Sequence, residues 1–152
     1  MPDDLLNSTQ KHIHNVRVYF EDTDAAGIVY YANYLKFAER ARTEMLREFG
    51  LHHSLMLQQN RQAFVVRQCT VDYLHPGFLD DCLAVQTSVT ELRRMTVTMQ
   101  QEIIRQGEKL VQISVKLACI DNQKKPIRIP VAFIDALEMN RFCKIALRRN
   151  TQ

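Results

Sequence analysis

Apolar side chains recur at two different periods along the chain, and each period predicts a different kind of element. Between residues 34 and 49 they are spaced by three or four positions, which places them on one face of a helix. The members of this face are Tyr34, Ala38, Ala41, Met45 and Phe49. Asn33 is a favoured N-cap residue and Gly50 a typical C-terminal stop. We therefore expect one long amphipathic helix at 34–49.

Alternating apolar and polar positions predict five strands. One lies before the helix at 15–20, and four follow it at 63–74, 82–92, 95–105 and 109–120. The last strand is the clearest, because its inward positions are all apolar: Val111, Ile113, Val115, Leu117 and Cys119. Residues 92–95 and 106–107 are typical of hairpin turns, so we expect the four later strands to form an antiparallel meander. Residues 51–61 are expected as a short helix or loop, and residues 133–147 as an amphipathic helix.

This order of elements predicts an α+β domain. Five half-buried strands and one helix are best accommodated by a strongly curved antiparallel sheet wrapped around the helix. The chain has 152 residues, the length of one domain, so we assign 1–152 to a single unit. An open sheet leaves an edge strand, which favours dimerisation by sheet extension or helix packing.

The charge distribution argues against a nucleic-acid partner. The net charge of +3 comes from the tail at 139–152, which holds four basic residues and no acid, whereas the other 138 residues carry 16 bases and 17 acids. Nucleic-acid binders usually carry positive charge on the folded body. We expect the tail to be a frayed terminus, with a peripheral contact to an anionic membrane or an acidic carrier protein as the alternative.

The predictions of cellular location and of metal binding rest on motifs that the sequence does not contain. The first ten residues do not have the build of a signal peptide, and no run of 18 apolar residues is present, which predicts a cytoplasmic protein. The four cysteines, at 69, 82, 119 and 143, have no metal-ligand spacing with the histidines. We expect reduced thiols and no metal site. The histidines are predicted to be surface or turn residues.

Candidate chemistry is concentrated between the first strand and the helix. Glu21, Asp22 and Asp24 are three acids within four residues, and Gly27 follows them. The start of a helix offers free backbone N–H groups that can stabilise an oxyanion, and a carboxylate opposite them can attack a carbonyl or deprotonate water. The alternative is a solvated acidic turn with Asx-type contacts, which the spacing alone favours.

Residues 17–46, RVYFEDTDAAGIVYYANYLKFAERARTEML, closely resemble the active-site signature of acyl-CoA thioesterases of the 4-hydroxybenzoyl-CoA thioesterase class. Within that class the chain looks most like the bacterial Tol–Pal-associated thioesterases, and residues 64–85, FVVRQCTVDYLHPGFLDDCLAV, fit the same subgroup. The resemblance covers about 13–135 and implies the hot-dog fold, in which a curved sheet surrounds one helix.

The resemblance also implies roles for individual residues. The family's catalytic aspartate corresponds to Asp24, acting as nucleophile or as general base. The thioester oxygen is expected to accept backbone N–H groups near the helix start, for which Tyr31 is a better match than Gly27. Tyr19 matches a tyrosine that orients substrate or water. The subgroup usually has histidine where this chain has Tyr31, and tyrosine does not exchange protons near pH 7 as histidine does.

Binding residues and assembly are expected from the same comparison. Lys124, Lys125 and Arg128 form a basic cluster suited to the phosphates of coenzyme A, with a merely solvated cluster as the alternative. Glu39 and Glu44 are expected to be solvated or ion-paired. Because hot-dog subunits build sites across dimer interfaces, a homo-oligomer is expected, either a dimer or a homotetramer formed as a dimer of dimers.

The sequence therefore predicts an acyl-CoA thioesterase that needs no cofactor and releases a free acid and coenzyme A, with acyl carrier protein as a second possible carrier of substrate. One rival is a hot-dog dehydratase, which needs a histidine that the signature lacks. The other is a non-catalytic protein of lipid or envelope machinery that binds acyl-CoA or acyl carrier protein.

Overall fold

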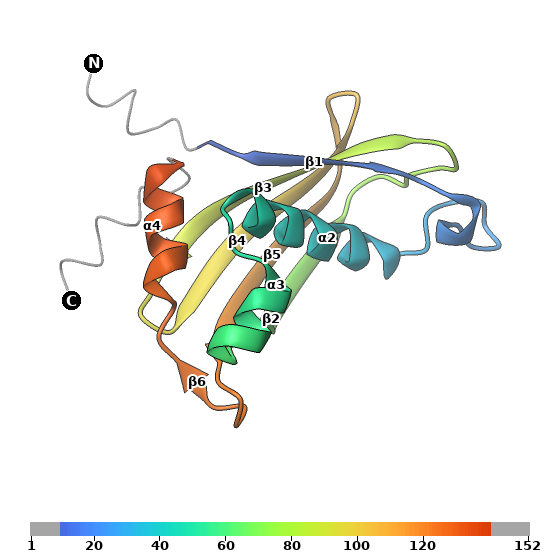
Figure 1. Cartoon of the computed structure of the whole chain (residues 1–152). Helices are drawn as coiled ribbons and strands as arrows, with labels where there is room; N and C mark the ends of the chain where they lie inside the picture. Colours follow the sequence, from blue (N-terminus) through green and yellow to red (C-terminus); the bar gives the residue numbers. More distant parts are fainter. Residues whose placement is uncertain (1–9, 141–152) are drawn as a thin grey trace, which may run out of the picture.

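The computed structural model describes residues 10–140 of the chain (Figure 1). The elements follow one another as β1 (His12–Arg17), η1 (Phe20–Asp22), α2 (Asn33–Glu48), α3 (His53–Leu55), η2 (Met56–Asn60), β2 (Ala63–Tyr73), β3 (Cys82–Leu92), β4 (Thr96–Arg105), β5 (Glu108–Ile120), β6 (Pro126–Ile127) and α4 (Val131–Met139). The five predicted strands and the long helix are all present, and β6 is a short addition.

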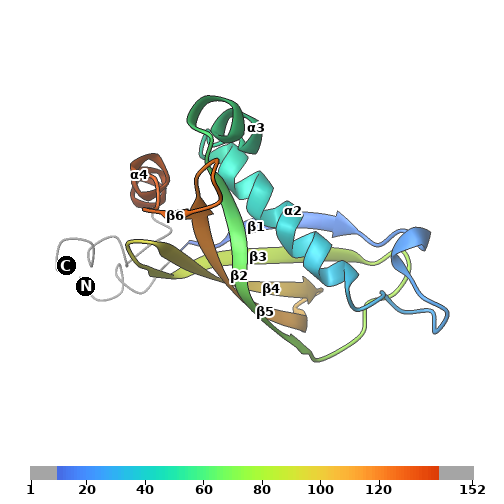
Figure 2. The ribbon, with the colours of Figure 1, turned by 90° about the horizontal axis from the view of Figure 1, so that it is seen from below.

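The strands form one antiparallel sheet in the order β1-β3-β4-β5-β2, and β6 pairs with the end of β5. Figures 1 and 2 show the sheet curving around α2. Register shifts interrupt the β2–β5, β3–β4 and β4–β5 pairs. Such bulges increase local twist, and this helps the sheet to curve around the helix.

The predicted hairpins are confirmed, but the meander of four strands is wrong for β2. Strand β2 does not lie beside β3; it pairs with β5 at the opposite edge of the sheet, from Ala63↔Ile120 to Tyr73↔Val111. The turn after β2 is a long loop rather than a hairpin, so it carries the chain across to the other side of β4. Hairpin signals identify neighbours only where two strands are joined by a tight turn.

The predicted apolar face of α2 packs into the sheet. Tyr34, Ala38, Ala41 and Met45 are buried in one continuous core with the inward residues of β3, β4 and β5, and Phe49, just after the helix, is half-buried against it. Phe37, which the predicted face did not include, is completely buried as well. The inward positions predicted for β5 are buried as well. Free thiols are found at Cys69, Cys82 and Cys119, as expected, while Cys143 lies outside the described residues.

The predicted strand at 15–20 is displaced, because its apolar alternation continues beyond the strand itself. β1 pairs with β3 only as far as Arg17, and Phe20 begins the 3-10 turn η1. Val18 is buried although it lies outside the strand, whereas Phe20 is 82% exposed. The alternation therefore continues to Val18 because that side chain is buried, although the strand pairing has ended.

The two helix ends differ from their sequence predictions. Helix α2 begins at Asn33, so Asn33 is not its N-cap; its side-chain Nδ2 instead donates to the Asp22 carbonyl at 2.9 Å. At the C-terminus, α4 begins at Val131, two residues before the predicted start at 133, and extends to Met139. The predicted continuation to residue 147 and most of the basic tail lie outside the described residues. No helix among residues 10–140 is long and apolar enough to cross a membrane.

Candidate active site

The acidic loop, residues 19–31, begins with a turn that its own polar side chains stabilise. The Asp22 carboxylate accepts the Tyr19 N–H at 2.8 Å, and the Asp22 N–H donates to the Tyr19 carbonyl at 2.9 Å. The Thr23 hydroxyl donates to the Phe20 carbonyl at 2.7 Å. Two of the three residues in the Asp-Thr-Asp sequence are therefore used to shape the loop.

Asp24, the second acid of the Asp-Thr-Asp sequence, is left available by this turn. Its side chain is half-buried, and one carboxylate oxygen, Oδ1, accepts the Ala26 N–H at 2.9 Å. Among residues 10–140 no group donates to its other oxygen and no basic side chain forms an ion pair with it. The Asx-type contact expected of a simple acidic turn is thus present, and it occupies only one of the two oxygens.

Gly27 closes the loop behind Asp24. Its φ of +81° is in the left-handed region that favours glycine, and its N–H donates to the Asp24 carbonyl at 3.0 Å. The Asp24 N–H in turn donates to the Ile28 carbonyl at 2.9 Å. The Gly27 N–H is therefore already used within the loop.

Tyr31 stands two residues before α2 begins, at the positive end of the helix dipole. In the part of the chain that the structure describes, the Tyr31 N–H has no backbone acceptor, although the Tyr31 carbonyl accepts the Tyr73 hydroxyl at 3.2 Å. The Tyr31 ring is 60% exposed and lies edge-on to the rings of Tyr30 and Tyr73. The Tyr19 ring is also 60% exposed.

A second loop, residues 74–81, holds the acidic loop in place. The Val29 N–H donates to the Gly77 carbonyl at 2.9 Å, and the Gly77 N–H donates to the Tyr34 hydroxyl at 2.9 Å. A side chain on Gly77 would be tightly packed, because its Cβ would lie 3.1 Å from the Tyr34 hydroxyl oxygen and 3.2 Å from a Val29 methyl, and these groups would have to shift slightly. Burial raises the pKa of Tyr34, so its hydroxyl stays protonated.

An ion pair anchors the 74–81 loop to the sheet. Arg105 Nη1 donates to the Asp81 carboxylate at 2.8 Å and also reaches the Pro76 carbonyl at 3.2 Å, while the guanidinium lies over the Phe78 ring. Burial raises the pKa of Asp81, but the hydrogen bonds from Arg105 and the Phe78 N–H outweigh it, and the pKa falls below the ordinary value. The sequence analysis did not identify this pair, because Arg105 lies on another strand.

The predicted basic cluster is far from Asp24 within one chain. Lys124, Lys125 and Arg128 are exposed and follow the end of β5 that pairs with Ala63, whereas Tyr31 contacts the other end of β2 at Tyr73. The two sites are separated by most of the eleven residues of β2, about 30 Å at the rise of a strand. Figures 1 and 2 show the acidic loop and β6 at opposite ends of the molecule.

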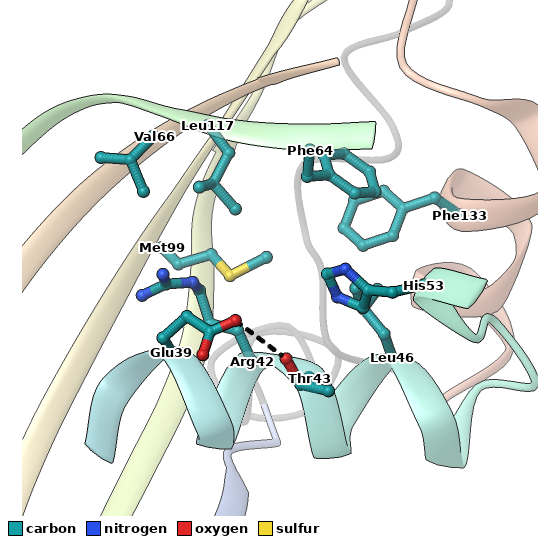
Figure 3. Close-up of a pocket in the computed structure, with 10 residues that line it drawn as sticks. All are labelled: Glu39, Arg42, Thr43, Leu46, His53, Phe64, Val66, Met99, Leu117 and Phe133. Atoms are coloured by element: carbon teal, nitrogen blue, oxygen red, sulfur yellow. Dashed lines mark hydrogen bonds between the residues drawn. The ribbon is translucent and has the colours of Figure 1, made fainter. Parts of the chain in front are cut away.

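A cavity of about 110 Å³ lies between the second half of α2 and the sheet (Figure 3). Its apolar lining comes from α2, β2, β4, β5 and α4, and its polar lining from α2 and α3. The lining residues are Glu39, Arg42, Thr43, Leu46, His53, Phe64, Val66, Met99, Leu117 and Phe133.

This cavity includes residues that the sequence analysis assigned to the surface. Glu39 is exposed and accepts a weak hydrogen bond from the Thr43 hydroxyl at 3.3 Å, and Glu44 pairs with Arg47 at 3.5 Å, as expected. His53, however, lines the cavity, and its Nε2 is buried without a hydrogen-bond partner among residues 10–140. The prediction of a surface or turn position is wrong for His12, which is 5% exposed because β1 places it against the core.

No group of three or more His, Cys, Asp or Glu side chains among residues 10–140 is arranged to hold a metal ion. The acids of the acidic loop are spread along a turn, and two of them make the contacts described above. The candidate chemistry at this loop is therefore that of a single carboxylate beside backbone donors.

Comparisons with known proteins show which family the chain resembles. The family model described as the thioesterase-like superfamily matches residues 18–137. The acyl-CoA thioesterase YbgC of Haemophilus influenzae is 45% identical over 116 residues, which cover 76% of this chain and 85% of that protein. The acyl-CoA thioester hydrolase YbgC of Escherichia coli O157:H7 is 45% identical over 121 residues, covering 78% and 90%.

Among solved structures, a probable thioesterase from Bartonella henselae superposes with a TM-score of 0.77 at 35% identity, covering 79% of this chain and 99% of that one. The curved antiparallel sheet around one helix is thus the hot-dog fold that the signature implied. The chain belongs to the thioesterase-like superfamily.

Proposed function

We propose that this protein hydrolyses acyl-CoA thioesters to a free acid and coenzyme A, and that Asp24 is the reacting carboxylate. The observation that carries the proposal is the Asp24 side chain, which is half-buried and has one oxygen held by the Ala26 N–H and the other without a partner among residues 10–140. The names of the relatives that are 45% identical to the chain support the reaction class.

Two routes are compatible with this carboxylate. As a nucleophile, Asp24 attacks the thioester carbonyl carbon, the C–S bond breaks, the coenzyme A thiolate leaves, and water then hydrolyses the mixed anhydride. As a general base, Asp24 takes a proton from water, the hydroxide attacks the same carbon, and the thiolate leaves from the tetrahedral intermediate. Both routes consume one water and place negative charge on the carbonyl oxygen.

The Tyr31 N–H is the best candidate to stabilise that oxyanion. It has no backbone acceptor within the described residues and lies at the positive end of the α2 dipole. The Gly27 N–H already donates to the Asp24 carbonyl, so we assign Gly27 to the shape of the turn. The exposed Tyr19 ring is proposed to orient substrate or water at the mouth of the site. In this scheme Tyr31 acts through its backbone, and the absence of a histidine does not prevent catalysis.

The edge strand β2 supports a homodimer. Among residues 10–140 its eleven residues pair on one side only, with β5, and most are exposed, including Val66 at 52% and Tyr73 at 46%. A two-fold axis that pairs two β2 strands antiparallel would cover these side chains and continue the sheet. The same axis would bring the basic cluster of one subunit towards the acidic loop of the other. We propose that Lys124, Lys125 and Arg128 bind the coenzyme A phosphates across this interface.

The test of the reaction is free-thiol release from short, long and aromatic acyl-CoAs by the wild type and by Asp24→Asn. Loss of the only carboxylate proposed to react should lower kcat by about 100-fold or more. Glu21→Gln is the matched control, since it also changes an acid of the same loop to an amide, at an exposed position that the proposal does not use. Equal turnover by Asp24→Asn and the wild type would exclude the proposed role of Asp24. No turnover by any protein, with carrier-protein thioesters included, would favour the binding-protein alternative.

A mixing experiment tests the shared site. One subunit carries Asp24→Asn and the other carries Lys124→Glu, Lys125→Glu and Arg128→Glu. If sites combine both subunits, half of a random mixture is heterodimer with one intact site in two, so activity should recover to about a quarter of wild type. Activity that stays at the level of the separate variants would argue against the interface.

A further inference from the structure

The cavity beside α2 contains a cation, Arg42, that forms no ion pair among residues 10–140, although Glu39 lines the same cavity. Arg42 lines the cavity, and its Nη1 donates to the uncharged Gln101 Oε1 at 2.9 Å. Among residues 10–140 no carboxylate oxygen lies within 4.0 Å of the guanidinium. Burial lowers the pKa of Arg42 because desolvation disfavours its charged form, and the nearby charge of Glu39 offsets only part of this effect.

Gln101 holds this guanidinium at the cavity wall. The Gln101 side chain is completely buried, and its Nε2 donates to the Ala38 carbonyl at 2.9 Å and to the Thr87 hydroxyl at 3.0 Å. Both amide hydrogens of Gln101 are thus donated to groups on α2 and β3, and its amide oxygen accepts the hydrogen bond from Arg42. Arg42 therefore keeps a defined position, and its other N–H groups remain available to a ligand.

The rest of the cavity is suited to a small apolar group. Figure 3 shows Arg42 at one end and the rings of Phe64 and Phe133 at the other, with Met99 and Leu117 along the wall. The volume of about 110 Å³ is of the order of the cavity of about 150 Å³ that accepts benzene in an engineered protein. A short alkyl chain or a small ring attached to one charged group would fit these walls.

We propose that this cavity binds small carboxylic acids, with the carboxylate on Arg42 and the apolar body between Leu46, Phe64 and Phe133. A guanidinium pairs with a carboxylate through two parallel hydrogen bonds, and such a pair is strongest where water is excluded. At the far end, His53 Nε2, which has no hydrogen-bond partner in the described part of the chain, provides a partner for a water or for a second polar atom of the ligand. The site does not include Asp24, and it stands whether or not the protein hydrolyses thioesters.

If the proposed function is correct, the acids released at Asp24 belong to the same chemical class as the ligand of this cavity. The cavity would then hold the acid that the reaction releases. Free acid added to the solution would compete with that product for the cavity. This consequence rests on the proposed function, but the binding site itself does not. Binding is therefore tested with the free acid alone, in the absence of coenzyme A.

The experiment is a titration of the full chain with hexanoate, followed by calorimetry and by amide chemical shifts, with hexan-1-ol as a neutral ligand of equal length. Arg42→Gln should weaken hexanoate binding by about 10-fold or more, because a charge-assisted hydrogen bond is lost. Hexan-1-ol binding should change by less than about twofold, since its apolar contacts are retained.

Two further variants separate a binding effect from a folding defect. Glu39→Gln should strengthen hexanoate binding by about threefold, because it removes a negative charge near the carboxylate, and damage to the fold would not improve binding. Asp24→Asn should bind hexanoate within about twofold of wild type, since Asp24 lies outside the cavity.

Four results would overturn the proposal. One is equal hexanoate affinity in the wild type and Arg42→Gln, and another is chemical-shift changes confined to residues 19–31. The third is no binding by the wild type at about 10 mM, well above a millimolar dissociation constant. Binding of hexan-1-ol without hexanoate would show an apolar cavity and would also exclude the carboxylate assignment.

Discussion

The first turn of α2 and the rest of the helix, which we call the loop end and the core end, are held by different kinds of interaction. Its first turn meets the acidic loop and the 74–81 loop through directional hydrogen bonds, from Asn33 Nδ2 to the Asp22 carbonyl and from the Gly77 N–H to the Tyr34 hydroxyl. Its middle turns are buried in the sheet through Phe37 and Ala41, both 0% exposed. The loop end must leave Asp24 open to a substrate, so hydrogen bonds hold it without covering it. The core end is free to exclude water, and the burial of its apolar side chains stabilises the fold.

The largest expected effect tests the core end. Phe37→Ala removes a completely buried ring and should lower the free energy of unfolding by about 3–5 kcal/mol, measured by urea denaturation. Phe20→Ala in the acidic loop is the matched control, because the Phe20 ring is 82% exposed. It should change stability by less than about 0.5 kcal/mol. Similar costs for the two variants would contradict the contrast between the two ends.

A glycine substitution tests the loop end. Gly77→Ala places a methyl against the Tyr34 hydroxyl and Val29, and should cost about 1–3 kcal/mol of stability. Because Val29 belongs to the acidic loop, we also expect thiol release from acyl-CoA to fall by about 10-fold.

Gly107→Ala is the control for that substitution. Gly107 has φ +81° in the β4–β5 hairpin, and a Cβ there meets nothing within 4 Å. Alanine should therefore cost about 1 kcal/mol through backbone strain and leave turnover unchanged. Loss of turnover in Gly107→Ala, or full turnover in Gly77→Ala, would mean that the 74–81 loop does not position the acidic loop.

The smallest effect concerns the ion pair that anchors the loop end. The pKa of Asp81 is lowered in the folded protein, so the pair contributes stability above the ordinary aspartate pKa of about 3.9 and loses it as the pH falls through the lower folded-state pKa. Both side chains are 21% exposed, and Asp81→Asn should cost about 1 kcal/mol at pH 7. The difference from wild type should shrink below about pH 3.9. A difference that is independent of pH between 7 and 3 would show that the charge of Asp81 contributes nothing.

Much of the fold follows from local patterns. The helix period at 34–49 and the alternation in 109–120 predicted α2 and β5 within one or two residues of their bounds, and the two turns predicted the hairpins of β3, β4 and β5. The errors occur where contacts with a segment far away in the sequence determine the local structure. Strand β2 pairs with β5 and not with β3, and Asn33 bonds to the carbonyl of Asp22 instead of capping the helix.

The two candidate sites differ in the same respect, because one is local in the sequence and the other is not. The acidic loop is one continuous segment, so its acids and Gly27 were recognisable as a group. The cavity is assembled from residues far apart in the chain, and Arg42 and Gln101, for example, are separated by 59 positions. No spacing pattern connects such residues, and Arg42 alone looks like one more charge on the polar side of a helix. The Arg105–Asp81 pair was missed for the same reason.

The sequence by itself determined the elements, the hairpins, the apolar face of α2 and the acidic loop with Asp24, because each depends on residues within a few positions of one another. Only the tertiary structure decided which edge β2 occupies, which carbonyl Asn33 binds, and where Arg42 lies. These features depend on contacts between segments whose packing against α2 is set by the whole sheet. A chain encodes its local geometry in short periods, whereas the surroundings of a charged group depend on every element that excludes water from it.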